Sequence, residues 1–135
     1  MMLQRDLQLD TRDRQVVDVT DVVEEFAREA GGDGLLNLLL PHATAGLALM
    51  ETGSGSEADL VDSLQRLLPR DDRYRHRHGS PGHGADHLLP AIVAPTLTLP
   101  VRDGRVHLGT WQRVAVVDLN ADNPRRTLRL SLLRG

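Results

Sequence analysis

The sequence predicts an α+β fold formed as a single domain over residues 1–135, with two main helices and the element order ββ-α-ββ-α-βββ. Three observations lead to this prediction. The length of 135 residues fits one domain. Strand patterns occupy both ends of the chain, and two amphipathic helical patterns lie among them.

The predicted strands are short apolar or alternating runs bounded by turn residues. They cover residues 2–9, 15–19, 35–40, 45–50, 96–101, 105–119 and 128–132. The turn-like link Asp10–Asp13 favours a hairpin between the first two strands. Asp103-Gly104 favours another hairpin, between strands 96–101 and 105–119.

Two amphipathic segments predict the main helices. Asp21 is expected to begin the first helix, and Gly31 to end it. Ser54 or Ser56 is expected to cap the second helix, and Pro69 to end it.

A polar segment rich in glycine and histidine, Arg70–Asp86, follows the second helix. It is long for a structureless loop, and loops of this length are usually functional or disordered. A short helix over Leu88–Val93 is expected after it, with Pro90 in its first turn.

The composition excludes several kinds of chemistry. The chain has no cysteine, and its 16 basic residues are all arginine, so disulfides, thiolate ligands and lysine Schiff bases are excluded. The net charge of −3 disfavours nucleic-acid binding. No signal-peptide pattern is evident, and no apolar run approaches the ~20 residues of a membrane span. We therefore expect a cytoplasmic protein without a membrane partner.

Histidines, the commonest metal ligands in proteins, concentrate in the polar segment. They are His76, His78, His83 and His87. In a helix, His83 and His87 would share a face at the i, i+4 spacing of helical zinc pairs, but Gly82 and Gly84 argue against a helix there. The alternative is a solvated loop with scattered histidines.

Two polar residues flank the fourth predicted strand. His42 precedes it, beside a turn of small residues, where a side chain could face a pocket or serve as a hydrogen-bonded structural residue. Glu51 follows it and could be a metal ligand, a base or an orienter of histidine, or could simply be solvated.

Two segments near the end of the chain could contact a ligand. Gly109–Gln112 is expected within strand 105–119, where Trp111 would be a core or interface residue. Arg125 and Arg126 could hold a phosphate or carboxylate, or could form ion pairs on the surface.

Short motifs occur in the same order as in the YjbQ-like family, whose members are described as secondary thiamine-phosphate synthases. His42–Glu51 resembles the family's His-Thr-Thr/Ser-Ala-Gly/Ser-Leu…Asn-Glu motif, and Tyr74–His76 resembles its Tyr-x-His. The other matching segments are His87-Leu88, Leu99–Val101, Gly104–Val106, Gly109–Gln112 and Pro124–Arg126. Each motif is weak alone, but the ordered set is specific.

The resemblance implies two β-sheets in a sandwich and assembly as a homotrimer. It also implies that His42, His76 and His87 meet in a pocket and bind a divalent metal, Zn²⁺ for a three-histidine site, or Mg²⁺ if a diphosphate binds. Glu51 and Gln112 join these histidines as expected catalytic residues. The expected substrate contacts are Thr44, Trp111, Arg125 and Arg126. The histidines expected outside the site are His78, His83 and His107.

The family reaction joins hydroxymethylpyrimidine diphosphate to thiazole phosphate and releases diphosphate. This sequence departs from the family pattern at Met50, Ser54-Gly55 and Leu89, where the family has Asn, Asp-Pro and Lys. His83 stands where the family has Asn, and it could add a metal ligand or only a surface charge. The missing Asp and Lys are natural partners of Mg²⁺ and phosphate. Three functions therefore stay open: a thiamine-phosphate synthase, a metal-dependent small-molecule hydrolase with Glu51 as base, and a non-catalytic trimer that binds a metabolite or a metal.

Overall fold

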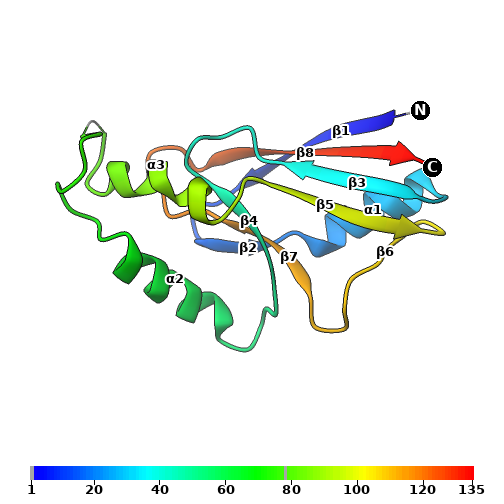
Figure 1. Cartoon of the computed structure of the whole chain (residues 1–135), viewed down its shortest axis with the longest axis horizontal. Coiled ribbons are helices and arrows are strands. Elements are labelled where there is room, and N and C mark those ends of the chain that lie inside the picture. The colour runs from blue at the N-terminus through cyan, green and yellow to red at the C-terminus, as the bar shows by residue number, and fades with distance from the viewer. Residues whose placement is uncertain (1, 78) are drawn as a thin grey trace.

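The computed structural model describes residues 2–77 and 79–135, which form two antiparallel β-sheets (Figure 1). The larger sheet consists, in spatial order, of β1 (Met2–Asp10), β8 (Arg125–Arg134), β3 (Gly34–Leu39), β5 (Thr96–Arg102) and β6 (Arg105–Val106). The smaller sheet consists of β2 (Val16–Asp18), β7 (Arg113–Val117) and β4 (Gly46–Met50).

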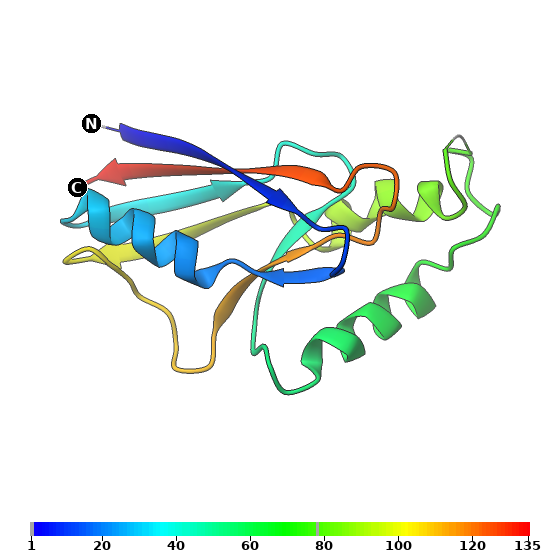
Figure 2. The same ribbon diagram turned by 180° about the vertical axis from the view of Figure 1, so that it is seen from behind.

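The helices cover opposite ends of this pair of sheets. Within the described residues they are α1 (Thr20–Ala30), α2 (Ser56–Leu67) and α3 (His83–Ile92). Helix α1 lies at the end that carries both termini, whereas α2 and α3 lie at the other end (Figure 2). None of the helices within residues 2–77 and 79–135 is long and apolar enough to span a membrane.

The main core is aliphatic and joins the two sheets to α1. It includes Leu36 and Leu130 of the larger sheet, Val116 of the smaller sheet and Phe26 of α1, all buried. Each of these side chains removes apolar surface from water at roughly 25 cal/mol per Å². The alternating burial of β8 reflects this packing, because successive side chains point to opposite faces of a sheet.

A second apolar cluster fixes α2 and α3 beside the smaller sheet. Leu64 of α2, Leu89 of α3 and Val117 of β7 are its buried members, with Ala85 at the start of α3. Helix α3 therefore has a rigid support on the side that faces the core.

The predicted α+β class, with two sheets and two main helices in one domain, is confirmed. The Asp103-Gly104 hairpin is confirmed as the link between β5 and β6, and both of its residues have a positive φ, 50° and 72°. The hairpin predicted between the first two strands is wrong. Strand β1 pairs with β8 and β2 pairs with β7, so the link Asp10–Asp13 passes from one sheet to the other.

The predicted strand 105–119 is also wrong in its middle. Strand β6 ends at Val106 and β7 begins at Arg113. Between them the Gln112 N–H donates to the Gly109 carbonyl at 3.1 Å, and the Gln112 side-chain oxygen accepts from the Gly109 N–H at 2.8 Å. These two bonds close a turn in the segment that was expected to be extended.

Candidate metal centre

Helix α3 begins at His83, and not at Leu88 as predicted. Gly82 precedes the helix with a φ of 86°, in the left-handed region that glycine adopts without strain. Gly84 lies in the first turn, where an added Cβ would be 2.6 Å from the carbonyl oxygen of His76. Gly82 and Gly84 argued against a helix in the sequence, but in the structure they allow the preceding loop to pack against α3.

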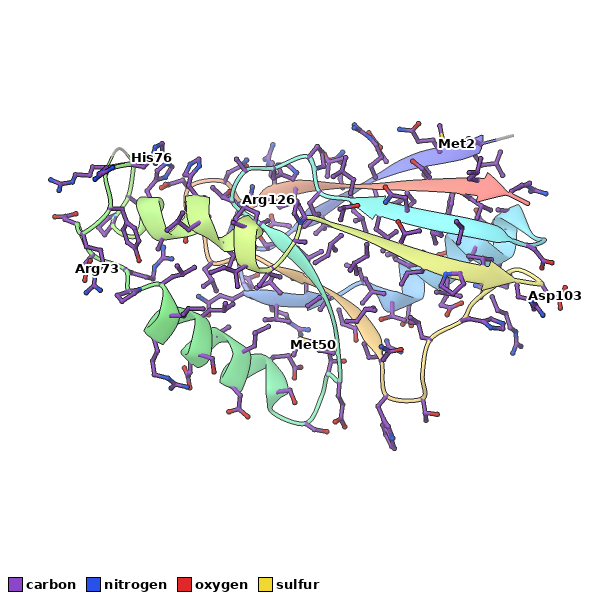
Figure 3. The ribbon with its side chains drawn as sticks, in the orientation of Figure 1. Met2, Met50, Arg73, His76, Asp103 and Arg126 are labelled. Carbon is purple, nitrogen blue, oxygen red and sulfur yellow. The ribbon has the colours of Figure 1, made fainter. Side chains whose placement is uncertain are left out.

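Three histidines converge at the start of α3. His83 and His87 lie one helical turn apart, with their Nε2 atoms 2.9 Å from each other. His76 comes from the preceding loop, and its ring centroid lies 5.0 Å from that of His83 and 4.2 Å from that of His87. One ring nitrogen of each histidine lies within 4.8 Å of the other two. Figure 3 shows His76 at this end of the molecule.

The histidine cluster formed by His76, His83 and His87 has the donor set of a zinc site. Zinc with three histidine ligands keeps one position open for water or substrate. Zn–N bonds of about 2.0–2.1 Å place the nitrogens of a tetrahedral site about 3.3 Å apart, and the 2.9 Å spacing of His83 and His87 is close to this value. A cavity of about 140 Å³ adjoins the cluster, lined by His76, His83, Arg77 and Ser80 among others.

A buried carboxylate holds α3 in place. Asp86 lies between His83 and His87 in the sequence and is 1 % exposed. Arg70 donates to both of its oxygens, and the Asn120 amide donates to it at 2.8 Å. The hydrogen bond from Arg70 to Asp86 raises the pKa of the guanidinium, because it favours the charged form. These contacts tie the helix to the end of α2 and to the turn after β7.

His42 does not belong to the histidine cluster. Its Nε2 accepts a hydrogen bond from the backbone N–H of Thr127 at 2.8 Å. A neutral imidazole that accepts at Nε2 carries its proton on Nδ1, so neither nitrogen offers a free lone pair to a metal. The structure therefore brings His76 and His87 together with His83, and not with His42 as expected.

Acid is expected to destabilise the folded chain through His42. Burial, followed by the charge of Arg126, lowers the pKa of His42 from its ordinary value of 6.5. The unfolded chain then binds a proton before the folded chain does, so the free energy of unfolding falls as the pH drops below that value. With a chelator present, urea unfolding at about pH 7 and about pH 5.5 should show a larger loss for the wild type than for His42→Gln. Equal losses for the two proteins would contradict this account.

Two of the predicted substrate contacts, Arg126 and Thr44, lie in the core. Arg126 is 1 % exposed and donates to the two oxygens of Asp118 at 2.7 and 3.0 Å and to the Thr44 hydroxyl at 2.8 Å. The Thr11 hydroxyl donates to the same carboxylate at 2.7 Å. The guanidinium is thus engaged in a buried ion pair, while the neighbouring Arg125 is exposed.

The remaining predicted site residues also lie outside the histidine cluster. Glu51 is exposed in the loop after β4, and its neighbour Met50 lies well apart from His76 in Figure 3. Trp111 is 72 % exposed at the turn between β6 and β7, so its interpretation as a core residue is wrong. Gln112 uses its side-chain oxygen to close that same turn.

His83, which the resemblance placed outside the site, lies in the histidine cluster. The signal that could have found it is its i, i+4 spacing to His87, which was outweighed by the two adjacent glycines. His107 is exposed and outside the cluster, as expected. The prediction for His78 falls outside the residues that the structure describes.

Comparisons with known proteins agree with one another. Residues 5–135 match a family described as UPF0047 protein YjbQ-like. The chain is 63% identical over 129 residues to a UPF0047 protein of Mycobacterium tuberculosis, covering 96% of each chain. A hypothetical protein from Aeropyrum pernix K1 has a TM-score of 0.88 at 33% identity, covering 98% of this chain and 99% of that one. A protein of unknown function from Sulfolobus solfataricus P2 shares the fold, with a TM-score of 0.91 at 22% identity and coverage of 100% and 99%. The chain therefore belongs to the UPF0047 family of YjbQ-like proteins.

Proposed function

We propose that the protein binds one Zn²⁺ ion through His76, His83 and His87 and hydrolyses a small polar substrate beside it. The observation that carries this proposal is the convergence of three imidazole nitrogens within 4.8 Å. A zinc ion held by three histidines keeps an open position and lowers the pKa of a bound water to about 7, which supplies a nucleophile for hydrolysis.

The residues around the histidine cluster supply rigidity and a binding space. Asp86 anchors the helix that carries two of the ligands, so the cluster lies on a fixed element and not on a free loop. The adjacent cavity of about 140 Å³ fits only a small molecule, and the charged side chains on its wall, Asp71, Asp72 and Arg77, favour a polar substrate. Glu51 does not reach this cavity's lining, so we assign it no role as a base.

The thiamine-phosphate synthase reaction is supported by the family resemblance alone. It needs groups that hold a diphosphate, and one arginine expected for that role, Arg126, is already paired with Asp118 in the core. The departures at Met50, Ser54-Gly55 and Leu89 remove further groups of this kind. Metal-assisted hydrolysis therefore has the stronger structural support. Assembly as a homotrimer stays a proposal that rests on the same resemblance.

Metal content and turnover test the proposal together. The purified protein is stripped with a chelator and titrated with Zn²⁺ in competition with a chromophoric chelator. We expect one tightly bound zinc per chain, and zinc-dependent turnover in a panel of small phosphoesters, carboxylic esters and lactones. Absence of stoichiometric zinc would refute the metal centre. Zinc binding without turnover across the panel would instead favour the non-catalytic metal-binding alternative.

A further inference from the structure

His83 uses its two ring nitrogens in different directions. Its Nδ1 faces the Asp122 carboxylate at 3.1 Å, and its Nε2 faces Nε2 of His87 at 2.9 Å. A carboxylate accepts only, so Nδ1 carries the proton in this contact and the lone pair of Nε2 points into the histidine cluster. In the hydrogen bond between the two Nε2 atoms, His87 is then the donor, because Nε2 of His83 carries no proton and can only accept.

Asp122 is itself held in place by contacts that lead back to α3. The backbone N–H of Asp122 donates to the Asn120 side-chain oxygen at 3.0 Å, and the Asn120 amide donates to Asp86 of α3 at 2.8 Å. Asp86 and His83 belong to the same helix, so the contacts form a closed circuit from α3 through Asn120 and Asp122 back to α3. This circuit fixes the distance between the carboxylate and the imidazole.

The chain also packs closely over the contact between His83 and Asp122. At Gly79, which has a φ of 86°, an added Cβ would lie 2.6 Å from Nδ1 of His83 and 3.1 Å from the Asp122 carboxylate. The next residue, Ser80, donates its backbone N–H to the same carboxylate oxygen at 3.3 Å. The carboxylate is thus aligned by the Ser80 backbone N–H as well as by the imidazole.

We propose that Asp122 is the positioning residue of the metal centre, which holds His83 in the tautomer and ring orientation that direct Nε2 to the ion. This inference rests on the proposed zinc site and adds a residue that does not touch the metal. Carboxylates that accept from the outer nitrogen of a histidine ligand fix its tautomer and raise its basicity, and their loss typically costs about 10–100-fold in metal affinity.

The test compares three variants for zinc affinity by chelator competition. Asp122→Ala is expected to bind zinc about 10–100-fold more weakly than the wild type. Asp122→Asn keeps an acceptor oxygen for Nδ1–H, so we expect it to restore most of the affinity. Asp6→Ala is the matched control, because Asp6 has a similarly exposed side chain, 41% against 37%, but pairs with Arg129 on the larger sheet.

A second readout separates positioning from a general structural effect. Long-range ¹⁵N–¹H spectra of the metal-free proteins report which ring nitrogen of His83 carries the proton. We expect Nδ1–H in the wild type and in Asp122→Asn, and loss of this preference in Asp122→Ala.

The outcomes distinguish the two proposals. Wild-type protein that binds no zinc would overturn the metal centre and this inference with it. If the wild type binds zinc but Asp122→Ala binds it equally tightly, the role of Asp122 alone would be overturned. An unchanged His83 tautomer in Asp122→Ala would have the same consequence.

Discussion

Replacing His83 by alanine is expected to abolish stoichiometric zinc binding, whereas replacing His42 by alanine should leave one zinc per chain. His83 contributes one of the three converging nitrogens. His42 instead accepts the Thr127 N–H and has no free lone pair. The loss of affinity in His83→Ala should exceed about 100-fold, because loss of a ligand's hydrogen-bond partner alone costs about 10–100-fold.

Elemental analysis and zinc titration of both variants measure this difference. His107→Ala serves as a control that removes an exposed imidazole outside the histidine cluster. If His42→Ala lost its zinc while His83→Ala kept it, the ligand set expected from the family resemblance would replace the one described here.

Replacing Arg126 by methionine is expected to lower the free energy of unfolding by about 3–5 kcal/mol. The substitution leaves the Asp118 carboxylate, with a side chain 0% exposed, without its charged partner in the core. The Thr11 hydroxyl and the Asn120 N–H still donate to it, but neither neutralises the charge. An uncompensated buried charge is among the costliest defects in a folded protein.

Urea unfolding followed by circular dichroism measures the loss, with Arg129→Met as the matched control. Arg129 lies on the same strand and pairs with Asp6 at 2.9 Å, but both side chains are partly exposed, 36% and 41%. Exposed pairs contribute about 0–1 kcal/mol, so this control should remain close to the wild type. Similar losses in the two variants would show that burial does not set the strength of the Arg126–Asp118 pair.

Much of the fold follows from local patterns. The alternation of Leu128, Leu130 and Leu132 with polar neighbours identifies the half-buried strand β8, and Asp103-Gly104 identifies the hairpin between β5 and β6. Both follow from the sequence because side-chain period and turn conformation are local properties. Strand pairing is not local. The turn residues of the link Asp10–Asp13 are compatible with a hairpin and equally with a crossover between sheets. The pairing of β1 with β8 and of β2 with β7 decides for the crossover.

The candidate site shows the same division. The family motifs identify His76 and His87, which do meet, whereas the i, i+4 spacing would place His83 beside His87 only if this segment were helical. Gly84 was read as a helix breaker, because glycine lowers intrinsic helix propensity. In the fold it allows the loop that carries His76 to approach α3, because any side chain at this position would collide with the His76 carbonyl oxygen.

The sequence by itself determined the family, the α+β class, the position of most strands and two of the three clustered histidines. The tertiary structure alone decided that His83 joins them, that His42 faces a backbone N–H, and that Arg126 is buried against Asp118. The reason is that residue type and spacing specify which groups are able to bind a metal or form an ion pair. Which of them do so depends on partners distant in the chain, and these are set by the packing of the two sheets and the helices at their ends.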